Sequence, residues 1–399
     1  MTKIIGGPSD KPRSLLASLD ALGVLQAAHE TWRREHPGSL VAEVEGHPGV
    51  RALGEEEHAF LHGALPLAFN AYVHETEEGS VEHGRGGELA DALSKQGLRL
   101  VFHEDLTVPG ERTSYYLAYD AAARRAILGV KGTDSIGDYL TDAVCASVPL
   151  PQREAPADGA TADASAATWI AHEGVLACTR ALLDDVGPML SELFGGFELL
   201  LTGHSLGGGV ACLAAILLTE AAEYRRFGEP FVGALRAVGF ATPPVVDRAT
   251  ALRCSSYVWT VVNNNDFVPR MSVRNLATLL HTLDETIALT RSEGAAAVQA
   301  NVGDTMRRAE EQSVERLESD LYCPGTVLWA YRDGDGAYHS AVHDGTLTFL
   351  SQVVPSNLVD HEKEPYFEAM VAVAPGGAAS RAAMPPTHCT AAEKAIDFI

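Results

Sequence analysis

The sequence has few features that would tie it to a membrane or to an export route. No run approaches the ~18 consecutive apolar residues that a membrane-spanning helix needs, and the amino-terminal region lacks the apolar core of a signal peptide. The most apolar segment, residues 210–218, has the length and composition of a buried helix. We therefore expect a cytoplasmic protein without a transmembrane segment.

Paired cysteines and positive charge are also scarce. The six cysteines are widely scattered, without a C-x-x-C pair or a metal-ligand spacing, which favours small buried thiols in a reducing compartment. The 30 Lys and Arg against 53 Asp and Glu give a net charge of -23, so nucleic acid and anionic membranes, which carry the same sign, are disfavoured as partners. A neutral lipid interface stays open. We expect no cofactor and no bound metal.

The most informative motif is G-x-S-x-G at Gly203–Gly207, in a chain of 399 residues whose 46% hydrophobic content supports a large core. An apolar run at 199–201 precedes the motif, and an Ala/Leu-rich segment of helical length follows it, which predicts a strand, a sharp turn and a helix. The small glycines allow the strand and helix to approach closely while Ser205 takes a strained backbone position. A glycine-rich loop with a capping serine is the alternative, but the flanking elements favour a nucleophile.

A second candidate turn lies earlier in the chain. Residues 113–119 and 126–130 predict two adjacent strands, and the second runs into Gly132 and Thr133. Hydrolases place an oxyanion donor at such a turn, and the other donor is the backbone N–H after the nucleophile, here that of Leu206. Gly132 and Thr133 could equally form only a turn and a helix cap. The pattern alone does not choose between these interpretations.

Two further groups of polar residues have a structural alternative that we prefer. Asp134, Asp138 and Asp142 are spaced along one helix face, which permits a calcium site but is more typical of a solvated surface near a helix start. His172 precedes a helix predicted to reach Leu193. It could touch the candidate site, but a histidine at a strand end is more often a hydrogen-bonded structural group, and that role is favoured.

A serine nucleophile needs an imidazole base and a carboxylate that orients it. Asp266 follows the predicted strand 257–262 and so lies on the same rim of the sheet as Ser205, in the order Ser, Asp, His. His361 is the favoured base, because it lies in a loop after the last predicted strand. In α/β-hydrolases the chain comes back to the nucleophile at that place. The histidines that follow Asp266 are His281, His339, His343, His361 and His388.

The pattern predicts an α/β protein with an α/β-hydrolase fold, in which helices flank a mostly parallel central sheet. Strands predicted at 325–331 and 345–350 bracket a turn at 333–336. We hypothesise that the sparsely apolar or aperiodic residues 143–168 and 281–320 form mobile cover over the site. The expected domains are an amino-terminal helical extension (1–95), a hydrolase domain (96–372) with a helical insertion (281–320), and a carboxy-terminal tail (373–399).

Together, the motif stretches resemble the class 3 lipases, and within them the sn-1-specific diacylglycerol lipase branch. The resemblance implies Ser205 as nucleophile, Asp266 as orienting acid, His361 as base, and Thr133 and Leu206 as oxyanion donors. The similar stretches are residues 115–144, 172–178, 199–215, 261–270 and 359–370.

The resemblance also implies a function. It is that of a serine lipase or carboxylesterase that hydrolyses acylglycerol esters of the diacylglycerol type through an acyl-enzyme, with a lipid ester as substrate and transient, peripheral contact with a lipid surface. The insertion falls where diacylglycerol lipases carry a regulatory loop, which suggests gating. Lys131 replaces the family's usual arginine, a change expected to alter a salt bridge rather than the chemistry. The alternatives are a lipase-like signalling or scaffold protein, and a phospholipase A1 or short-chain esterase.

Overall fold

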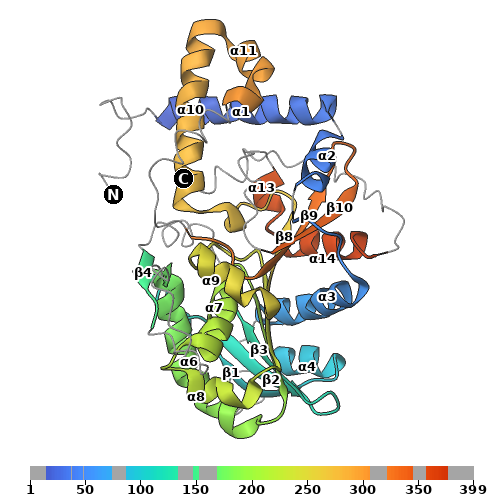
Figure 1. Cartoon of the computed structure of the whole chain (residues 1–399), viewed down its shortest axis with the longest axis vertical. Helices are drawn as coiled ribbons and strands as arrows, with labels where there is room; N and C mark the ends of the chain where they lie inside the picture. The colour runs from blue at the N-terminus through green and yellow to red at the C-terminus, as the bar shows by residue number, and fades with distance from the viewer. Residues whose placement is uncertain are drawn as a thin grey trace.

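A computed structural model describes residues 15–36, 38–47, 49–73, 87–133, 147–151, 169–305, 321–344 and 356–375. Within these ranges, eight strands form one central sheet in the order β1-β2-β3-β6-β7-β8-β9-β10 (Figure 1). The strands of this sheet are β1 (Arg99–Glu104), β2 (Tyr115–Asp120), β3 (Arg125–Val130), β6 (Glu198–His204), β7 (Leu235–Phe240), β8 (Val258–Asn263), β9 (Thr326–Arg332) and β10 (Tyr338–Asp344).

The sheet is mixed, with a parallel centre. Neighbouring strands from β3 to β9 run parallel, whereas the β1–β2, β2–β3 and β9–β10 pairs are antiparallel. The central strands are apolar on both faces, as a sheet covered by helices on both sides requires. The predicted α/β-hydrolase fold with a mostly parallel sheet is confirmed. A small antiparallel ribbon of β4 (Ser147–Pro149) and β5 (Ile170–His172) lies outside it.

Helices cover both faces of the sheet and enclose two hydrophobic cores (Figure 1). One layer contains α6 and α7, and the other contains α3, α4 and α14. Tyr116 of β2 links sheet and helix by donating a 2.7 Å hydrogen bond to the carbonyl oxygen of Leu67 in α3. The helices of these layers are α3 (Glu55–Asn70), α4 (Gly87–Lys95), α6 (Glu173–Leu193), α7 (Leu206–Glu220), α8 (Arg225–Gly228) and α14 (Lys363–Ala372).

Helix α7 is the most deeply buried helix of the core. Every residue from Leu206 to Leu218 is buried, because the helix packs between the sheet and α6. A helix that is apolar all round needs such an interior position. The sequence therefore fixes both the location of α7 and the position of the turn that starts it.

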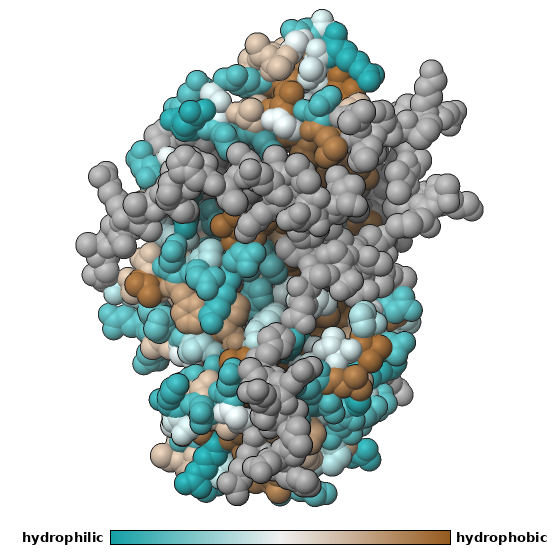
Figure 2. Space-filling model, turned by 180° about the vertical axis from the view of Figure 1, so that it is seen from behind, coloured by the Kyte–Doolittle hydropathy of each residue, from teal (hydrophilic) through white to brown (hydrophobic). Residues whose placement is uncertain are grey.

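The helices α1 (Leu15–Glu35), α10 (Val273–Glu293) and α11 (Ala295–Ala300) form an arm beside the hydrolase core (Figure 1). These three helices share a small apolar cluster that includes Leu25 of α1, Leu283 of α10 and Val298 of α11. Figure 2 shows brown apolar side chains between teal ones on this part of the surface. The segment of the arm that contains α10 and α11 leaves the core after the turn Val268–Arg270, and the chain returns at Cys323, whose Sγ lies 3.4 Å from the carbonyl oxygen of Pro269.

Parts of the expected organisation lie outside the described residues. These include residues 143–146, 152–168 and 306–320 of the hypothesised cover, so its mobility and the three domain boundaries stay predictions. The predicted turn at 333–336 is present, but β10 follows it directly at Tyr338–Asp344. The hairpin partner of β9 is therefore β10, and the strand expected at 345–350 lies outside the described residues. Histidines and Ser340 interrupt the apolar pattern of β10, which hid it in the sequence.

Replacing Leu213 with Ala should test how strongly the core depends on α7. Leu213 is completely buried, so Leu213→Ala should lower the free energy of unfolding by about 2–5 kcal/mol. Leu193 at the end of α6 is 56% exposed, and Leu193→Ala should cost less than about 0.5 kcal/mol. Denaturant unfolding of both variants measures the difference, and equal losses would contradict the placement of α7.

Candidate active site

Ser205 lies at the turn between β6 and α7 in a strained conformation, with φ 58° and ψ -131°. Close packing leaves room only for glycine on either side. A Cβ atom on Gly203 would lie 2.5 Å from the Gly207 backbone, and one on Gly207 would lie 2.3 Å from the carbonyl oxygen of Val130. The Ser205 N–H donates a 2.8 Å hydrogen bond to the carbonyl oxygen of Phe240. The turn thus holds Ser205 at the carboxyl rim of the sheet, at the start of α7.

Asp266 and His361 lie together although 95 residues separate them. The His361 Nδ1 atom is 3.0 Å from Asp266 Oδ1 and 3.1 Å from Oδ2. Tyr366 donates a 2.7 Å hydrogen bond to Oδ2, and the Val268 N–H donates a 3.0 Å hydrogen bond to Oδ1. The carboxylate is completely buried. Burial raises its pKa, but the His361 charge and these hydrogen bonds outweigh that effect and hold the pKa of Asp266 below its usual value.

A buried aspartate latches the His361 loop to the Asp266 loop. Asp360 precedes His361, and its Oδ2 atom accepts hydrogen bonds from the Asn264 side chain at 2.9 Å and from the Asn265 N–H at 3.1 Å. The Asn263 side chain donates a 2.9 Å hydrogen bond to the Asp360 carbonyl oxygen. Sequence reasoning missed this latch. The run of three asparagines before Asp266 was the available signal, because it continues a buried strand with three amide side chains that need hydrogen-bond partners.

Arg270 closes the Asp266 loop from the other side. Its Nε atom donates a 2.7 Å hydrogen bond to the carbonyl oxygen of Asp266, and its guanidinium also donates to the carbonyl oxygen of Asn264. Trp329 of β9 donates a 2.7 Å hydrogen bond to the same Asn264 oxygen. The backbone carbonyls of this tight loop are thereby satisfied within the protein.

One candidate oxyanion donor directly follows Ser205, and the other is next in sequence to Gly132, which lies against the serine turn. Leu206 is the first residue of α7, where a backbone N–H has no partner within the helix. Thr133 follows β3, and the adjacent Gly132 lies against the serine turn, since a Cβ atom on Gly132 would be 3.2 Å from the Ser205 Cβ. Asp134, Asp138 and Asp142, considered for calcium, fall outside the described residues.

His204 is a buried residue of the site that sequence reasoning did not single out. Its Nε2 atom lies 2.9 Å from the carbonyl oxygen of His361, and the two imidazole rings are 4.6 Å apart between centroids. A carbonyl only accepts, so Nε2 carries the proton. Burial and the neighbouring His361 charge lower the pKa of His204 to about 3, which keeps the ring neutral at pH 7 and leaves Nδ1 as an acceptor.

The other histidines of the candidate list lie in different settings. His339 is 2.9 Å from Asp333 in the β9–β10 hairpin, and His343 packs edge-on against His47 at a centroid distance of 5.6 Å. His281 is in α10, and His388 lies outside the described residues. His172 caps α6 by accepting a 3.4 Å hydrogen bond from the Val175 N–H, which agrees with the structural role that we favoured.

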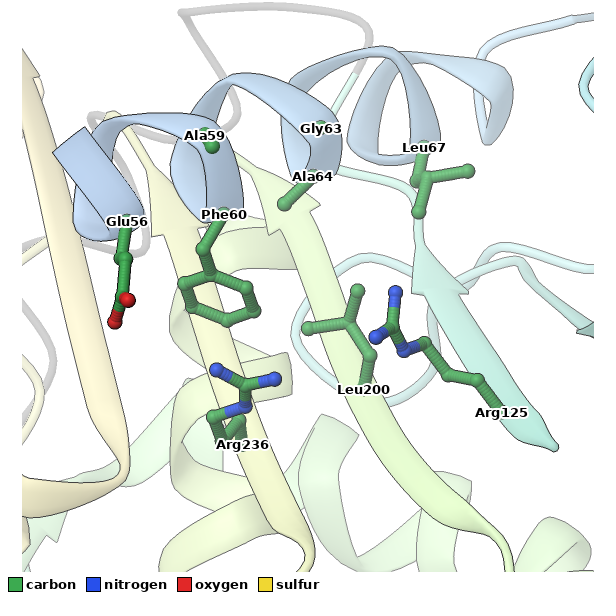
Figure 3. Close-up of a pocket in the computed structure, with 9 residues that line it drawn as sticks. All are labelled: Glu56, Ala59, Phe60, Gly63, Ala64, Leu67, Arg125, Leu200 and Arg236. Atoms are coloured by element: carbon green, nitrogen blue, oxygen red, sulfur yellow. The ribbon is translucent and has the colours of Figure 1, made fainter. Parts of the chain in front are cut away.

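A cavity of about 310 Å³ lies at the opposite end of the sheet from these residues (Figure 3). It opens between α3 and the first residues of the strands, where Phe60 and Leu200 meet the guanidinium groups of Arg125 and Arg236. The Arg236 guanidinium stacks on the Phe60 ring at 4.1 Å, and Arg125 pairs with Glu198 at 3.0 Å. These contacts lie at the amino-terminal ends of β3, β6 and β7 and do not involve the candidate site.

Neither a metal centre nor a membrane span is evident in the part of the chain that the structure describes. These residues contain no cluster of three or more His, Cys, Asp or Glu side chains that could hold a metal ion. No helix among them is long and apolar enough to cross a membrane.

Residues 127–276 match the family model of the class 3 lipases. A segment of this chain is thus similar to the class 3 lipases. Rat diacylglycerol lipase-alpha is 25% identical over 175 residues, which are 41% of this chain but 15% of the relative. Mouse diacylglycerol lipase-beta is 27% identical over 182 residues, which are 44% of this chain and 24% of the relative. The structure of Rhizomucor miehei triacylglyceride lipase matches with a TM-score of 0.49 at 20% identity, covering 78% of this chain and 96% of that one.

The chain therefore spans less than a quarter of the curated relatives' length. The segment that matches the class 3 lipase model includes Ser205 and Asp266. His361 and Tyr366 follow that segment, and Asp360 does so too. Hydrogen bonds that join His361 and Tyr366 to Asp266, and Asp360 to Asn264, bring these later residues to that segment.

Because His204 is neutral in the folded protein, the free energy of unfolding should fall as the pH is lowered. An unfolded histidine has a pKa of about 6.5, whereas the pKa of folded His204 is about 3. The unfolded chain therefore binds more protons between these values, and stability is lost as the pH falls through this window. Asp266, whose pKa is also lowered, loses its contribution only below about pH 4–5. Between pH 7 and 5, His204 should account for about 2 kcal/mol of lost unfolding free energy.

Denaturant unfolding at pH 7 and pH 5 checks this expectation. The His204→Gln variant should lose about 2 kcal/mol less than the wild-type chain over the same pH step. Comparing the pH difference within each protein removes the cost of the substitution itself. Equal losses in the two proteins would show that His204 is not held neutral in the fold.

Proposed function

We propose that this chain is a serine ester hydrolase that acts on acylglycerols, with Ser205, His361 and Asp266 as its catalytic residues. The observation that carries the proposal is the buried Asp266–His361 pair, with 3.0 Å between Oδ1 and Nδ1, on the rim where the strained Ser205 turn lies. The carboxylate engages Nδ1 and so directs the other ring nitrogen, Nε2, toward proton transfer. The segment similar to the class 3 lipases supports ester hydrolysis as the reaction.

In the proposed reaction, the Ser205 hydroxyl attacks the ester carbonyl while His361 Nε2 takes its proton. The backbone N–H groups of Leu206 and Thr133 stabilise the oxyanion of the tetrahedral intermediate, and one such donor is typically worth about 10²–10³ in rate. His361 then protonates the leaving alcohol, which leaves an acyl-enzyme. Water, deprotonated by the same imidazole, hydrolyses this ester and releases the fatty acid and the free serine.

Two observations support an apolar acyl substrate of the diacylglycerol type. The Phe267 ring lies 5.6 Å from the His361 ring, and the Val359 side chain is 44% exposed two residues before His361. The printed names of the curated relatives supply the diacylglycerol class. The net charge of -23 favours a neutral over an anionic lipid surface for transient contact, because like charges repel.

The alternatives differ in measurable ways. A lipase-like scaffold would bind partners without ester turnover. A phospholipase A1 would favour a phospholipid over a neutral diacylglycerol, and a short-chain esterase would favour butyrate over long-chain esters. A panel of nitrophenyl esters of increasing chain length, a diacylglycerol and a phosphatidylcholine separates these activities.

The Ser205→Ala variant tests the nucleophile. Turnover of every ester in the panel should fall to the level of a mock preparation, since the acyl-enzyme has no attachment point. A fluorophosphonate probe should label Ser205 in the wild-type chain and fail to label the variant. Ser191→Ala is the matched control, because the hydroxyl of this serine donates a 3.1 Å hydrogen bond to the carbonyl oxygen of Pro188 within the same helix, α6. Retained turnover in Ser205→Ala would refute the proposed nucleophile.

The Asp360 latch gives a second test, with two substitutions at one position. Asp360→Asn keeps an oxygen acceptor for Asn264 and Asn265, whereas Asp360→Leu removes it. The Leu variant should lose about 10- to 100-fold in kcat, because displacement of a supporting residue misplaces the base that it holds. The Asn variant should stay within a few-fold of wild type. Equal activity of the two variants would show that the Asp360 hydrogen bonds do not hold His361 in its active position.

A further inference from the structure

Tyr72 contributes a hydroxyl to the site from outside the segment that matches the class 3 lipases. It lies just after α3, and its Oη atom accepts a 3.1 Å hydrogen bond from the Gly132 N–H. The same atom lies 3.3 Å from both the carbonyl oxygen and the Nδ1 atom of His204. One hydroxyl thus touches the turn beside Thr133 and the strand end beside Ser205.

These contacts extend into a directed chain of hydrogen bonds. The phenol accepts from Gly132 and therefore donates its single proton toward His204, whose Nδ1 and carbonyl oxygen are both acceptors. The protonated Nε2 of His204 then donates to the carbonyl oxygen of His361 at 2.9 Å. The chain connects the oxyanion turn, the nucleophile strand and the loop of the base.

The packing around Tyr72 leaves little freedom. A Cβ atom on Gly132 would lie 2.4 Å from Tyr72 Oη and 2.7 Å from the His204 carbonyl oxygen. The ammonium group of Lys131 lies 6.0 Å from the centre of the Tyr72 ring, and the Phe69 and His204 rings lie 6.0 Å and 5.9 Å from it between centroids. Glycine is the most flexible residue in backbone conformation, so an external contact is needed to fix the peptide that leads to Thr133.

We propose that Tyr72 is a positioning residue that orients the Gly132–Thr133 turn, so that the Thr133 N–H points at the oxyanion. The proposal rests on the proposed function, because it assumes ester hydrolysis at Ser205. Tyr72 itself does not touch the reacting atoms. Its hydroxyl fixes the donor before substrate arrives, which is the condition under which backbone donors stabilise a transition state effectively.

The test is Tyr72→Phe, which removes only the hydroxyl. We expect kcat to fall about 10- to 100-fold while KM stays within about 3-fold, since the lost orientation affects the oxyanion more than the bound ester. An alkyl boronic acid forms a tetrahedral adduct with serine that places an oxygen in the oxyanion position. Its inhibition constant should rise by a similar factor. The matched control is Tyr257→Phe, which removes a hydroxyl that donates a 3.0 Å hydrogen bond to Glu220. Its kcat and inhibition constant should stay at wild-type values.

A double variant keeps the test informative if the phenylalanine variant is less stable. Tyr72→Phe combined with His204→Gln should lose little more kcat than the stronger single variant, because both changes break one chain of hydrogen bonds. Multiplicative losses in kcat, an unchanged kcat in Tyr72→Phe, or an equal fall in Tyr257→Phe would each overturn the proposal. Absence of ester turnover in the wild-type chain would instead refute the proposed function, and fluorophosphonate labelling of Ser205 distinguishes the two failures.

Discussion

The burial of one carboxylate organises the candidate site. Asp266 has no exposed surface, and a charge in such a position is tolerated only when hydrogen bonds replace water. His361, Tyr366 and the Val268 N–H supply those bonds from three places in the chain. The loop around the carboxylate must then be rigid, which explains why Arg270 binds its backbone carbonyls. The position of the imidazole follows from this need to satisfy a buried charge.

A second constraint is the close approach of β6 and α7 at Ser205. Contact at this density requires glycine at Gly203 and Gly207, and it places an uncapped helix start beside the serine. The strain of the positive φ is held because α7 is buried along its whole apolar length. The core that stabilises the fold therefore also fixes the backbone of the site.

Local sequence patterns predicted the strand before Ser205, the buried helix after it and the acid at the end of β8, because each is encoded by neighbouring residues. They also favoured His361 through its place after the last strand. Contacts made by tertiary folding were not visible in them. Tyr72 and Asp360 resemble ordinary residues of a helix end and a polar turn until the fold brings them to His204 and Asn264. The strand that pairs with β9 was missed because polar residues, including two histidines, interrupt the alternation of apolar residues in β10.

The segment between β8 and β9 that contains α10 and α11 leaves and rejoins the core almost at one point, since Cys323 Sγ lies 3.4 Å from the Pro269 carbonyl oxygen. An excursion with adjacent ends can change length at small entropic cost, about 0.6 kcal/mol for each doubling. Evolution can therefore lengthen, shorten or exchange this segment while the Asp266 loop keeps its geometry. Related chains are expected to differ most here, and exchanging this segment between relatives should leave the geometry of the Asp266 loop unchanged.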